Sequence, residues 1–569
     1  MAGHVNMMDD YLIANLPPPI LRSALRLLIS QGAITQKPFV EHVRARFREN
    51  PPTLRVFSTL FTGNDGVTSE CSAYVAQIRC MFSCKMSEES IPHLEQFVNA
   101  IYSRRVSWSE TSEVAKLLTS FDGDIVQAIQ ALKETDPPPT AELLITLNNF
   151  LASLKNCAEY CSAAQPRLRF PFARGRQQLQ DAIRFLFPQQ RSTSLPPTPP
   201  EPESEELASL PGEIRQAAVE TFRLGPFEVP RLFNGLWQLS SASWGSATTT
   251  DQERALTHAA KCGLTAADMA DHYGDAELVY GVFRNKFSKH SQTTVFAATK
   301  WCVFSPIPKP VTAAWVSDAV CERSRRLKGR VELLQFHWYD YTQKEYLDVL
   351  AELVLLTKTC PTTVSAIGLC NFDSAHLAEA CEHLIARFGE VGLVSNQVQF
   401  SLVDARPLRR MTETCEKYGL KLLTYGTLCG GFLSERWLDK PAPEPYSESN
   451  RLTPSQRKYL DTIHHWAPWH TFQALLTHLS SLAAAHSVSV SSVAARWVLQ
   501  QPAVGAVIVG ARLGVSEDHA DDNVRTFGFR LSGEEMGRLN EIALGAEGGR
   551  MKGVFERLGD CGREYRNVH

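Results

Sequence analysis

Four side chains of the kinds used in acid–base chemistry stand close together in the sequence: Asp268, Tyr273, Lys300 and His337. A phenol is a weak acid at neutral pH, but a nearby ammonium stabilises its phenolate, and a carboxylate keeps a buried ammonium charged. A histidine can donate a second hydrogen bond to an oxygen that gains negative charge. The set therefore favours proton delivery to a carbonyl oxygen during reduction over hydrolysis, which needs an activated nucleophile or a metal.

Taken singly, each of the four residues also has a structural interpretation. Asp268 could cap a helix, Lys300 could be a solvated strand end, His337 could be a satisfied core histidine and Tyr273 could be a packing residue. Their position is what distinguishes them, because three of them end successive strand-like segments and the fourth follows directly after one. We therefore expect the four side chains to meet at one edge of a parallel sheet.

Eight strand-like segments account for most of the sequence after residue 230. They are rich in apolar and β-branched residues and lie at 231–239, 263–270, 293–301, 330–338, 364–372, 393–400, 421–428 and 503–511. Amphipathic helical segments separate most of them, which predicts a (β/α)8 TIM barrel of the α/β class with chemistry at the carboxyl ends of the strands. A doubly wound sheet is the alternative, but no G-x-G-x-x-G follows the first strand.

The ordered motifs of these segments resemble those of the aldo-keto reductases over about residues 225–540. The segments that carry the resemblance are AADMADHYGDAE, FAATKW, LLQFHWYDY, IGLCNFD, SNQVQFSL, LLTYGTL and VIVGAR. The resemblance implies a TIM barrel that binds NADP(H) across its strand ends and reduces small aldehydes or ketones to alcohols. It implies that Tyr273 is the general acid, that Lys300 and Asp268 modulate it, and that His337 orients the carbonyl.

The resemblance also implies a set of cofactor-binding residues. Asn371 and Gln397 would hold the nicotinamide carboxamide, Tyr425 would stack on the nicotinamide ring, and the 2′-phosphate would meet Arg512. Further contacts implied for the pyrophosphate and adenosine are Gly426, Leu428, Gly430, His519, Asp522 and Asn523. An arginine fork suits a phosphate. Cys370 stands where the family usually has serine, which replaces a good hydrogen-bond donor to the cofactor with a weak one. His519 stands near a usual second cation, so NADP(H) is a preference over NAD(H).

The remaining sequence predicts a chain of two unequal parts. Residues 1–190 have helical periodicity, including a stripe of apolar residues behind Asp124 as an expected helix N-cap. Residues 191–215 are rich in Pro, Glu and Ser and are expected to form a linker. Residues 216–545 are expected to form the barrel, and residues 546–569 a C-terminal tail. The long stretch 431–471 is expected to be a lid or cofactor clasp.

Composition narrows the possible partners. Lys and Arg total 58 against 61 Asp and Glu, so the chain lacks the basic excess typical of nucleic-acid binding. No run of about 18 apolar residues predicts a membrane span, and no cysteine or histidine spacing predicts a metal site. We expect a cytoplasmic enzyme with a small carbonyl substrate. The alternative is a regulatory protein that senses NADP(H) with little turnover and contacts a protein partner through residues 1–190.

Overall fold

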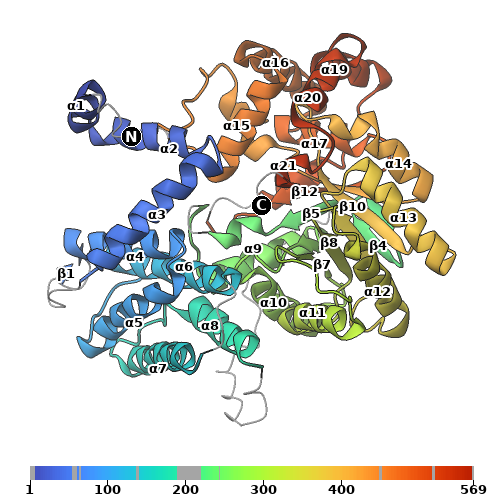
Figure 1. The fold of residues 1–569 in the computed structure, drawn as a ribbon. Helices are drawn as coiled ribbons and strands as arrows, with labels where there is room; N and C mark the ends of the chain where they lie inside the picture. Colours follow the sequence, from blue (N-terminus) through green and yellow to red (C-terminus); the bar gives the residue numbers. More distant parts are fainter. Residues whose placement is uncertain are drawn as a thin grey trace, which may run out of the picture.

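The computed structural model describes residues 7–53, 60–62, 66–135, 140–188, 219–241, 244–447, 451–515 and 519–566. The predicted linker at 191–215 lies outside the described residues. In Figure 1 the N-terminal helices, coloured blue to cyan, lie beside a barrel coloured green to red. Two large hydrophobic cores correspond to these two regions, one under the N-terminal helices and one between the barrel and its surrounding helices.

Eight parallel strands form a closed barrel in which each strand pairs with its neighbours in sequence and the last pairs with the first. They are β5 (Leu232–Gly235), β6 (Ala266–Asp268), β7 (Phe296–Cys302), β8 (Leu333–His337), β9 (Ile367–Cys370), β10 (Leu393–Gln399), β11 (Lys421–Tyr425) and β12 (Val504–Gly510). Each overlaps one predicted segment, and the (β/α)8 barrel is confirmed. The strands are buried on both faces, which explains their continuous apolar sequence.

Helices surround the barrel and fill its carboxyl-end loops. The helices that follow the strands are α9 (Thr249–Lys261), α10 (Ala276–His290), α11 (Ala313–Arg326), α12 (Glu345–Thr359), α13 (Ser374–Phe388), α14 (Met411–Tyr418), α16 (Trp469–His486) and α17 (Val490–Leu499). Additional helices are α15 (Pro454–Trp466), α18 (Ala520–Arg525), α19 (Gly533–Leu544), α20 (Gly549–Leu558) and α21 (Arg563–Arg566). The last two fall in the region that sequence analysis treated as a tail.

A short hairpin covers the end of the barrel where the strands begin. It consists of β3 (Thr221–Leu224) and β4 (Phe227–Pro230), which pair in antiparallel fashion. Leu224 and Val229 are buried in one cluster with residues from six barrel strands, among them Phe233 and Leu333. The hairpin was not predicted, and the Gly-Pro turn at 225–226 was its only sequence signal.

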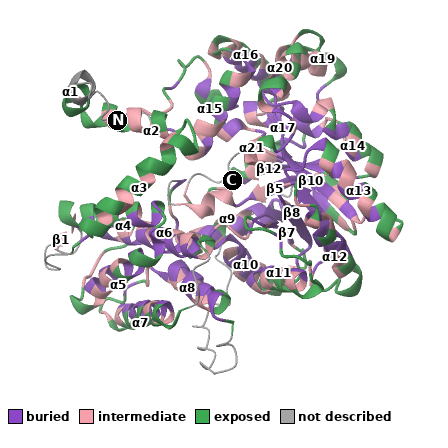
Figure 2. Ribbon diagram, in the orientation of Figure 1, coloured by how far each residue is buried: buried purple, intermediate pink, exposed green. Residues whose placement is uncertain are grey.

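The N-terminal region is helical, as predicted. It contains α1 (Met7–Asn15), α2 (Pro18–Ile29), α3 (Ala33–Glu49), α4 (Ser69–Ser83), α5 (Ser87–Ser103), α6 (Glu113–Glu134), α7 (Ala141–Ala163), α8 (Ala173–Leu186) and a two-residue pairing of β1 (Phe61–Thr62) with β2 (Gly66–Val67). Helices α4 to α8, which we call the helical domain, enclose the second core. Helices α2 and α3 bury none of their residues, and Figure 2 shows them largely exposed.

One helix boundary differs from its prediction. Helix α6 begins at Glu113, where the Ser112 side chain accepts a hydrogen bond from the Ala115 amide. Asp124 therefore lies inside the helix and is not its N-cap. Its buried carboxylate instead accepts hydrogen bonds from Arg79 Nε at 2.8 and 2.9 Å. A capping residue and a paired core carboxylate have the same sequence signal, and tertiary contact decides between them.

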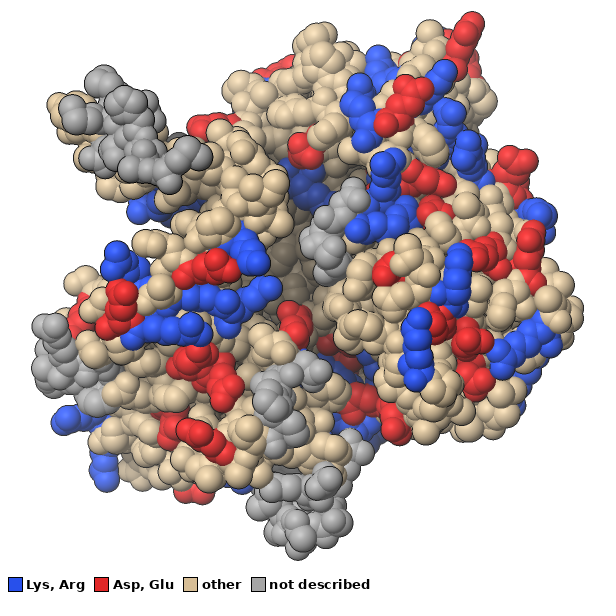
Figure 3. Space-filling view, viewed as in Figure 1, with Lys and Arg blue, Asp and Glu red and all other residues tan. Residues whose placement is uncertain are grey.

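The surface carries acidic and basic side chains interspersed, and on the face drawn in Figure 3 a hollow lies between the helical domain and the barrel. Among the described residues no single helix is long and apolar enough to cross a membrane. Helices α16 and α17 together are long and apolar enough to span a membrane, but the chain bends by 93° between them.

Candidate active site at the barrel mouth

The four predicted acid–base residues lie together at the carboxyl ends of β6, β7 and β8. Asp268 ends β6, Lys300 lies near the end of β7, and His337 ends β8. Lys300 Nζ donates to Asp268 Oδ2 at 2.5 Å and to the Met269 carbonyl at 2.9 Å. It lies 3.4 Å from Tyr273 Oη, on the loop that follows β6. Strands β6 and β7 thus bring a carboxylate, an ammonium and a phenol into one cluster.

The charges of this cluster follow from burial and pairing. Burial alone would lower the pKa of Lys300, but the adjacent Asp268 carboxylate raises it well above its usual value, so the ammonium stays charged. Burial raises the pKa of Tyr273, and the Lys300 ammonium opposes that rise. Tyr273 therefore holds its proton at neutral pH and has a cation beside the oxygen that would lose it.

His337 is neutral and has a defined tautomer. Burial lowers the pKa of its imidazole to about 4. Its Nδ1 lies 3.1 Å from the Cys370 carbonyl oxygen, which only accepts, so Nδ1 carries the hydrogen. In this state Nε2 is an acceptor and can receive a hydrogen bond from an alcohol. Donation to a carbonyl oxygen, as the sequence suggested, requires the imidazolium form.

Two glutamines that sequence analysis did not connect with the catalytic residues hold the Asp268 carboxylate. Gln335 Nε2 donates to Asp268 Oδ1 at 2.8 Å, and Gln397 Nε2 donates to the same oxygen at 2.7 Å. Gln397, predicted to bind the nicotinamide carboxamide, also donates to Gln335 Oε1 at 2.8 Å. Gln335 lies two residues before His337 on β8, so both face the barrel interior, and this alternation was the available sequence signal.

The loop that carries Tyr273 is held from the barrel side. Asp271 accepts a hydrogen bond from the Cys302 amide at 3.2 Å and pairs with the guanidinium of Arg323. Asp271, His272 and Cys302 have potential metal-ligating atoms within 4.8 Å of one another. Because the Asp271 carboxylate is already neutralised by Arg323, we interpret this group as a support for the loop.

The helical domain holds the same loop from the other side. Arg174 of α8 donates through Nε and Nη2 to the two oxygens of Asp275, both at 2.7 Å, and both side chains are buried. The carbonyl of Gly274 accepts hydrogen bonds from Arg326 at 2.8 Å and from Gln178 of α8 at 3.4 Å. Asp181 of α8 pairs with Arg326. The two residues after Tyr273 are therefore fixed by α8.

Two of the residues predicted to bind the nicotinamide contact the C-terminal segment of this chain. Tyr425 Oη donates to Asn371 Oδ1 at 2.9 Å and lies 3.2 Å from Tyr565 Oη. Tyr565 also accepts from Lys458 Nζ of α15 at 2.9 Å. The rings of Tyr565 and His337 meet edge to face with their centroids 5.8 Å apart. Tyr565 and Lys458 had not been identified from the sequence.

The predicted pyrophosphate segment lies against α15. A Cβ on Gly426 would lie 2.6 Å from Tyr459 Oη, and one on Gly430 would lie 3.2 Å from the Gln456 amide. Both glycines have positive φ, of 72° and 64°. Residues of α15 therefore occupy the space that a side chain at either glycine would fill. Leu428 is half-buried beside the barrel core.

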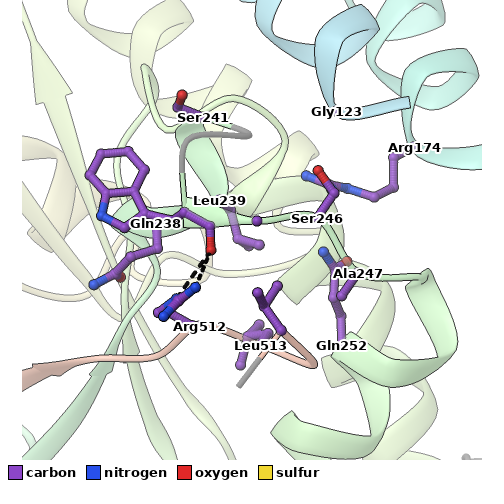
Figure 4. A pocket seen from close by; sticks show the side chains of 13 residues that line it. Gly123, Arg174, Gln238, Leu239, Ser241, Ser246, Ala247, Gln252, Arg512 and Leu513 are labelled. Atoms are coloured by element: carbon purple, nitrogen blue, oxygen red, sulfur yellow. Dashed lines mark hydrogen bonds between the residues drawn. The ribbon is translucent and has the colours of Figure 1, made fainter. Parts of the chain in front are cut away.

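The predicted adenosine end is closed around Arg512. Its Nη2 donates to the Trp244 carbonyl at 2.7 Å, and Trp244 Nε1 donates to Ser455 Oγ of α15 at 3.2 Å. The adjoining cavity measures about 10 Å³, room for about one water molecule. Figure 4 shows Arg174 and Arg512 at different edges of this cavity, with Gln238 on the side of Arg512 and Gln252 below Ala247.

The other predicted adenosine contacts lie on or beside α18, after β12. Asp522 accepts a hydrogen bond from Ser489 Oγ at 2.8 Å and so fixes the start of α17. His519 precedes α18, and Asn523 lies within it. These three residues lie on the part of the chain that the sequence predicted, but the Asp522 carboxylate already has a structural partner.

Comparison with known proteins identifies the family to which the barrel belongs. Residues 231–544 match the Aldo/keto reductase family. The chain is 24% identical over 347 residues to the chloroplastic pyridoxal reductase of Arabidopsis thaliana. The aligned region makes up 59% of this chain and 88% of that protein. It is 20% identical over 340 residues to the NADH-specific methylglyoxal reductase of Escherichia coli, 56% of this chain and 95% of that one.

Two further similarities differ in kind. The flagellar radial spoke protein 5 of Chlamydomonas reinhardtii is 28% identical over 270 residues, which are 41% of this chain and 49% of that protein. A crystal structure of the thermostable aldo-keto reductase Tm1743 with the inhibitor epalrestat aligns with a TM-score of 0.42 and 21% identity, over 57% of this chain and 99% of that one. Because the family match covers more than half of its length, this chain belongs to the aldo/keto reductase family and is therefore an oxidoreductase.

Proposed function

We propose that this protein is an NADP(H)-dependent reductase that converts a small aldehyde or ketone to the alcohol, with Tyr273 as the general acid. The observation that supports this most directly is the hydrogen-bonded chain from Asp268 through Lys300 to Tyr273 at the mouth of the barrel. When bound, the nicotinamide cofactor supplies the two electrons and the hydrogen that the carbonyl carbon receives.

The protein's own side chains would then supply one proton to the carbonyl oxygen. Tyr273 Oη gives its proton to the carbonyl oxygen as negative charge develops there. Lys300 stabilises the phenolate that remains, and Asp268, held by two glutamines, keeps the ammonium charged and in place. Neutral His337 accepts a hydrogen bond from the new hydroxyl through Nε2. The buried position of Asp268 and Lys300 excludes water from the pair and strengthens their attraction.

The side chains present fit a dinucleotide at its two ends. Tyr425 offers a half-exposed aromatic ring at the end of β11, and Arg512 offers a guanidinium suited to a 2′-phosphate. Buried side-chain oxygens of Gln238 and Gln252 have no hydrogen-bond partner among the described residues and could accept from a ribose or an adenine amino group. Between these ends, Trp244 and α15 must move to admit the ligand, which agrees with the lid expected at 431–471.

The primary experiment is NADPH consumption by the purified full-length protein with a panel of aldehydes, ketones and α-dicarbonyls. NADPH and NADH fluorescence titrations run in parallel give the cofactor preference. Turnover of at least one carbonyl that depends on Tyr273 is the expected result. Tight cofactor binding with no turnover of any carbonyl would overturn the reductase proposal.

A second candidate function is regulation, in which the protein binds NADP(H) with little turnover and responds through the helical domain to a protein partner. The buried contacts of α8 with the Tyr273 loop favour it, because movement of this domain would reach the general acid directly. Similarity to a protein named as a radial spoke component also supports a protein partner.

All fourteen cysteines are free thiols, which supports a reducing, cytoplasmic setting.

Arg174→Met tests this candidate more cleanly than a barrel trimmed of residues 1–215, which would leave Asp275 and Arg326 without Arg174 and Asp181. The control is Arg79→Met, because Arg79 pairs with Asp124 inside the helical domain. If the domain regulates the site, Arg174→Met changes kcat or NADPH affinity several-fold more than the control does. Equal behaviour of the two variants would make the domain a bystander.

A further inference from the structure

The C-terminal segment that follows α20 is built into the mouth of the barrel. Gly562 lies so close to the Asn371 carbonyl that a Cβ would come within 1.9 Å of it. Asp560 accepts from the Ser374 amide at 3.1 Å, and Arg566 donates to Asp373 at 2.7 Å. Contacts on both sides of Tyr565 therefore fix its ring beside the strand ends.

Tyr565 links the catalytic histidine to a second lysine. Its ring packs edge-on against His337, and its hydroxyl accepts from Lys458 Nζ at 2.9 Å. Lys458 also lies 5.3 Å from the centre of the Tyr425 ring and 5.4 Å from that of Tyr459. Together with the Tyr565 ring, 5.2 Å from the ammonium, these rings form a cage of three aromatic side chains around the cation.

The two lysines at the mouth differ in how their charge is balanced. Lys300 has a carboxylate partner in Asp268. Among the described residues, none of the ion pairs involves Lys458, and the neighbouring Glu564 is paired with Arg406 at 3.2 Å. Burial alone would lower the pKa of Lys458, but the phenols of Tyr565 and Tyr459 and the carboxylate of Glu564 raise it, so the ammonium stays charged. An ammonium that has no ion-pair partner of its own among the described residues is stabilised when an anion binds it.

We propose that Lys458 and Tyr565 form an anion-binding subsite that selects carbonyl substrates bearing a carboxylate or a phosphate. This inference rests on the proposed reductase function and specifies its substrate class. Tyr565 orients the ammonium through its hydroxyl and separates the anion from His337. Once α15 has closed again over the bound cofactor, the carbonyl group would lie at Tyr273 and His337 while the anionic substituent points toward Lys458 of α15.

The test compares 4-carboxybenzaldehyde with its methyl ester, two aldehydes that differ mainly in charge. The quantity measured is the ratio of kcat/KM for the acid to that for the ester, at saturating NADPH. In the wild-type protein the acid is preferred. Lys458→Met lowers the ratio about 10- to 100-fold, since a charge-assisted hydrogen bond is lost. Tyr565→Phe lowers it less, and Lys552→Met, an exposed lysine on α20, leaves it unchanged.

Two results would overturn the inference. A ratio that does not change in Lys458→Met would show that the ammonium does not select for charge. A loss of NADPH affinity in Lys458→Met, with the substrate ratio unchanged, would assign the lysine to a cofactor phosphate. If no aldehyde is reduced, calorimetric binding of 4-(hydroxymethyl)benzoate to wild type and to Lys458→Met still decides the matter, so failure of the reductase function is distinguishable from failure of the subsite.

Discussion

The ends of strands β6 to β8 and those of strands β9 to β12 are organised in opposite ways. At the first set, catalytic side chains contact one another directly, as the Asp268–Lys300 pair does. At the second set, predicted cofactor residues contact segments that come from far along the chain, such as Tyr425 with Tyr565 and Arg512 with Trp244. The proposed acid–base residues are therefore pre-organised, whereas the proposed cofactor groove would have to open.

The largest effect is expected from Tyr273→Phe, which tests whether the first set of strand ends is catalytic. Removing the general acid should lower kcat by about 100- to 10,000-fold. NADPH affinity should remain, because the cofactor residues lie at other strands. Stopped-flow fluorescence of NADPH binding and steady-state kinetics together measure both quantities. A variant with unchanged kcat would exclude Tyr273 as the proton donor.

Asp268→Asn tests whether the Lys300 ammonium needs its counter-charge. Both side chains are only about 3% exposed, so the change leaves a buried ammonium without a carboxylate. The free energy of unfolding should fall by about 3–5 kcal/mol, as urea denaturation would show. As a control, Glu49→Gln removes the exposed partner of Arg46 and should change stability by less than about 0.5 kcal/mol. Equal effects at both sites would contradict a buried, paired Lys300.

The lowered pKa of His337 predicts that the stability of the protein depends on pH. Its folded pKa of about 4 lies below the value near 6.5 of an unfolded histidine, so between these values the unfolded chain binds more protons. Stability is fully present above pH 6.5 and falls by about 3 kcal/mol as pH drops to 4. Thermal unfolding of wild type and His337→Gln at pH 7 and 4.5 measures this. If both proteins lose equal stability, the histidine is not the group that titrates.

Arg512→Met addresses the second set of strand ends and should have the smallest effect. If the guanidinium leaves Trp244 to bind a 2′-phosphate, the Kd for NADPH should rise about 10-fold while that for NADH stays the same. Fluorescence titration with both cofactors measures the difference. Equal loss for the two cofactors would assign Arg512 a structural role at Trp244.

Sequence reasoning worked best where one strand determines one side chain. Segments rich in apolar and β-branched residues, several of them nearly continuous, located all eight barrel strands, and their order placed Asp268, Lys300 and His337 at the same end of the barrel. Gln335 could have been found by the same alternation. Contacts such as Arg174 with Asp275 could not, because no local pattern relates residues 101 positions apart. For the same reason residues 546–569 were treated as a tail, although Tyr565 lies beside His337.

The contact of α8 with the Tyr273 loop also bears on how the protein is made. The helical domain leaves the ribosome before residues 275 and 326 are synthesised, so Arg174 and Asp181 spend that interval in water. An interface built from charged side chains stays soluble while it waits, whereas an apolar one would be prone to aggregation. Docking can then follow closure of the barrel, so the loop that carries Tyr273 would gain its contacts with α8 late in folding.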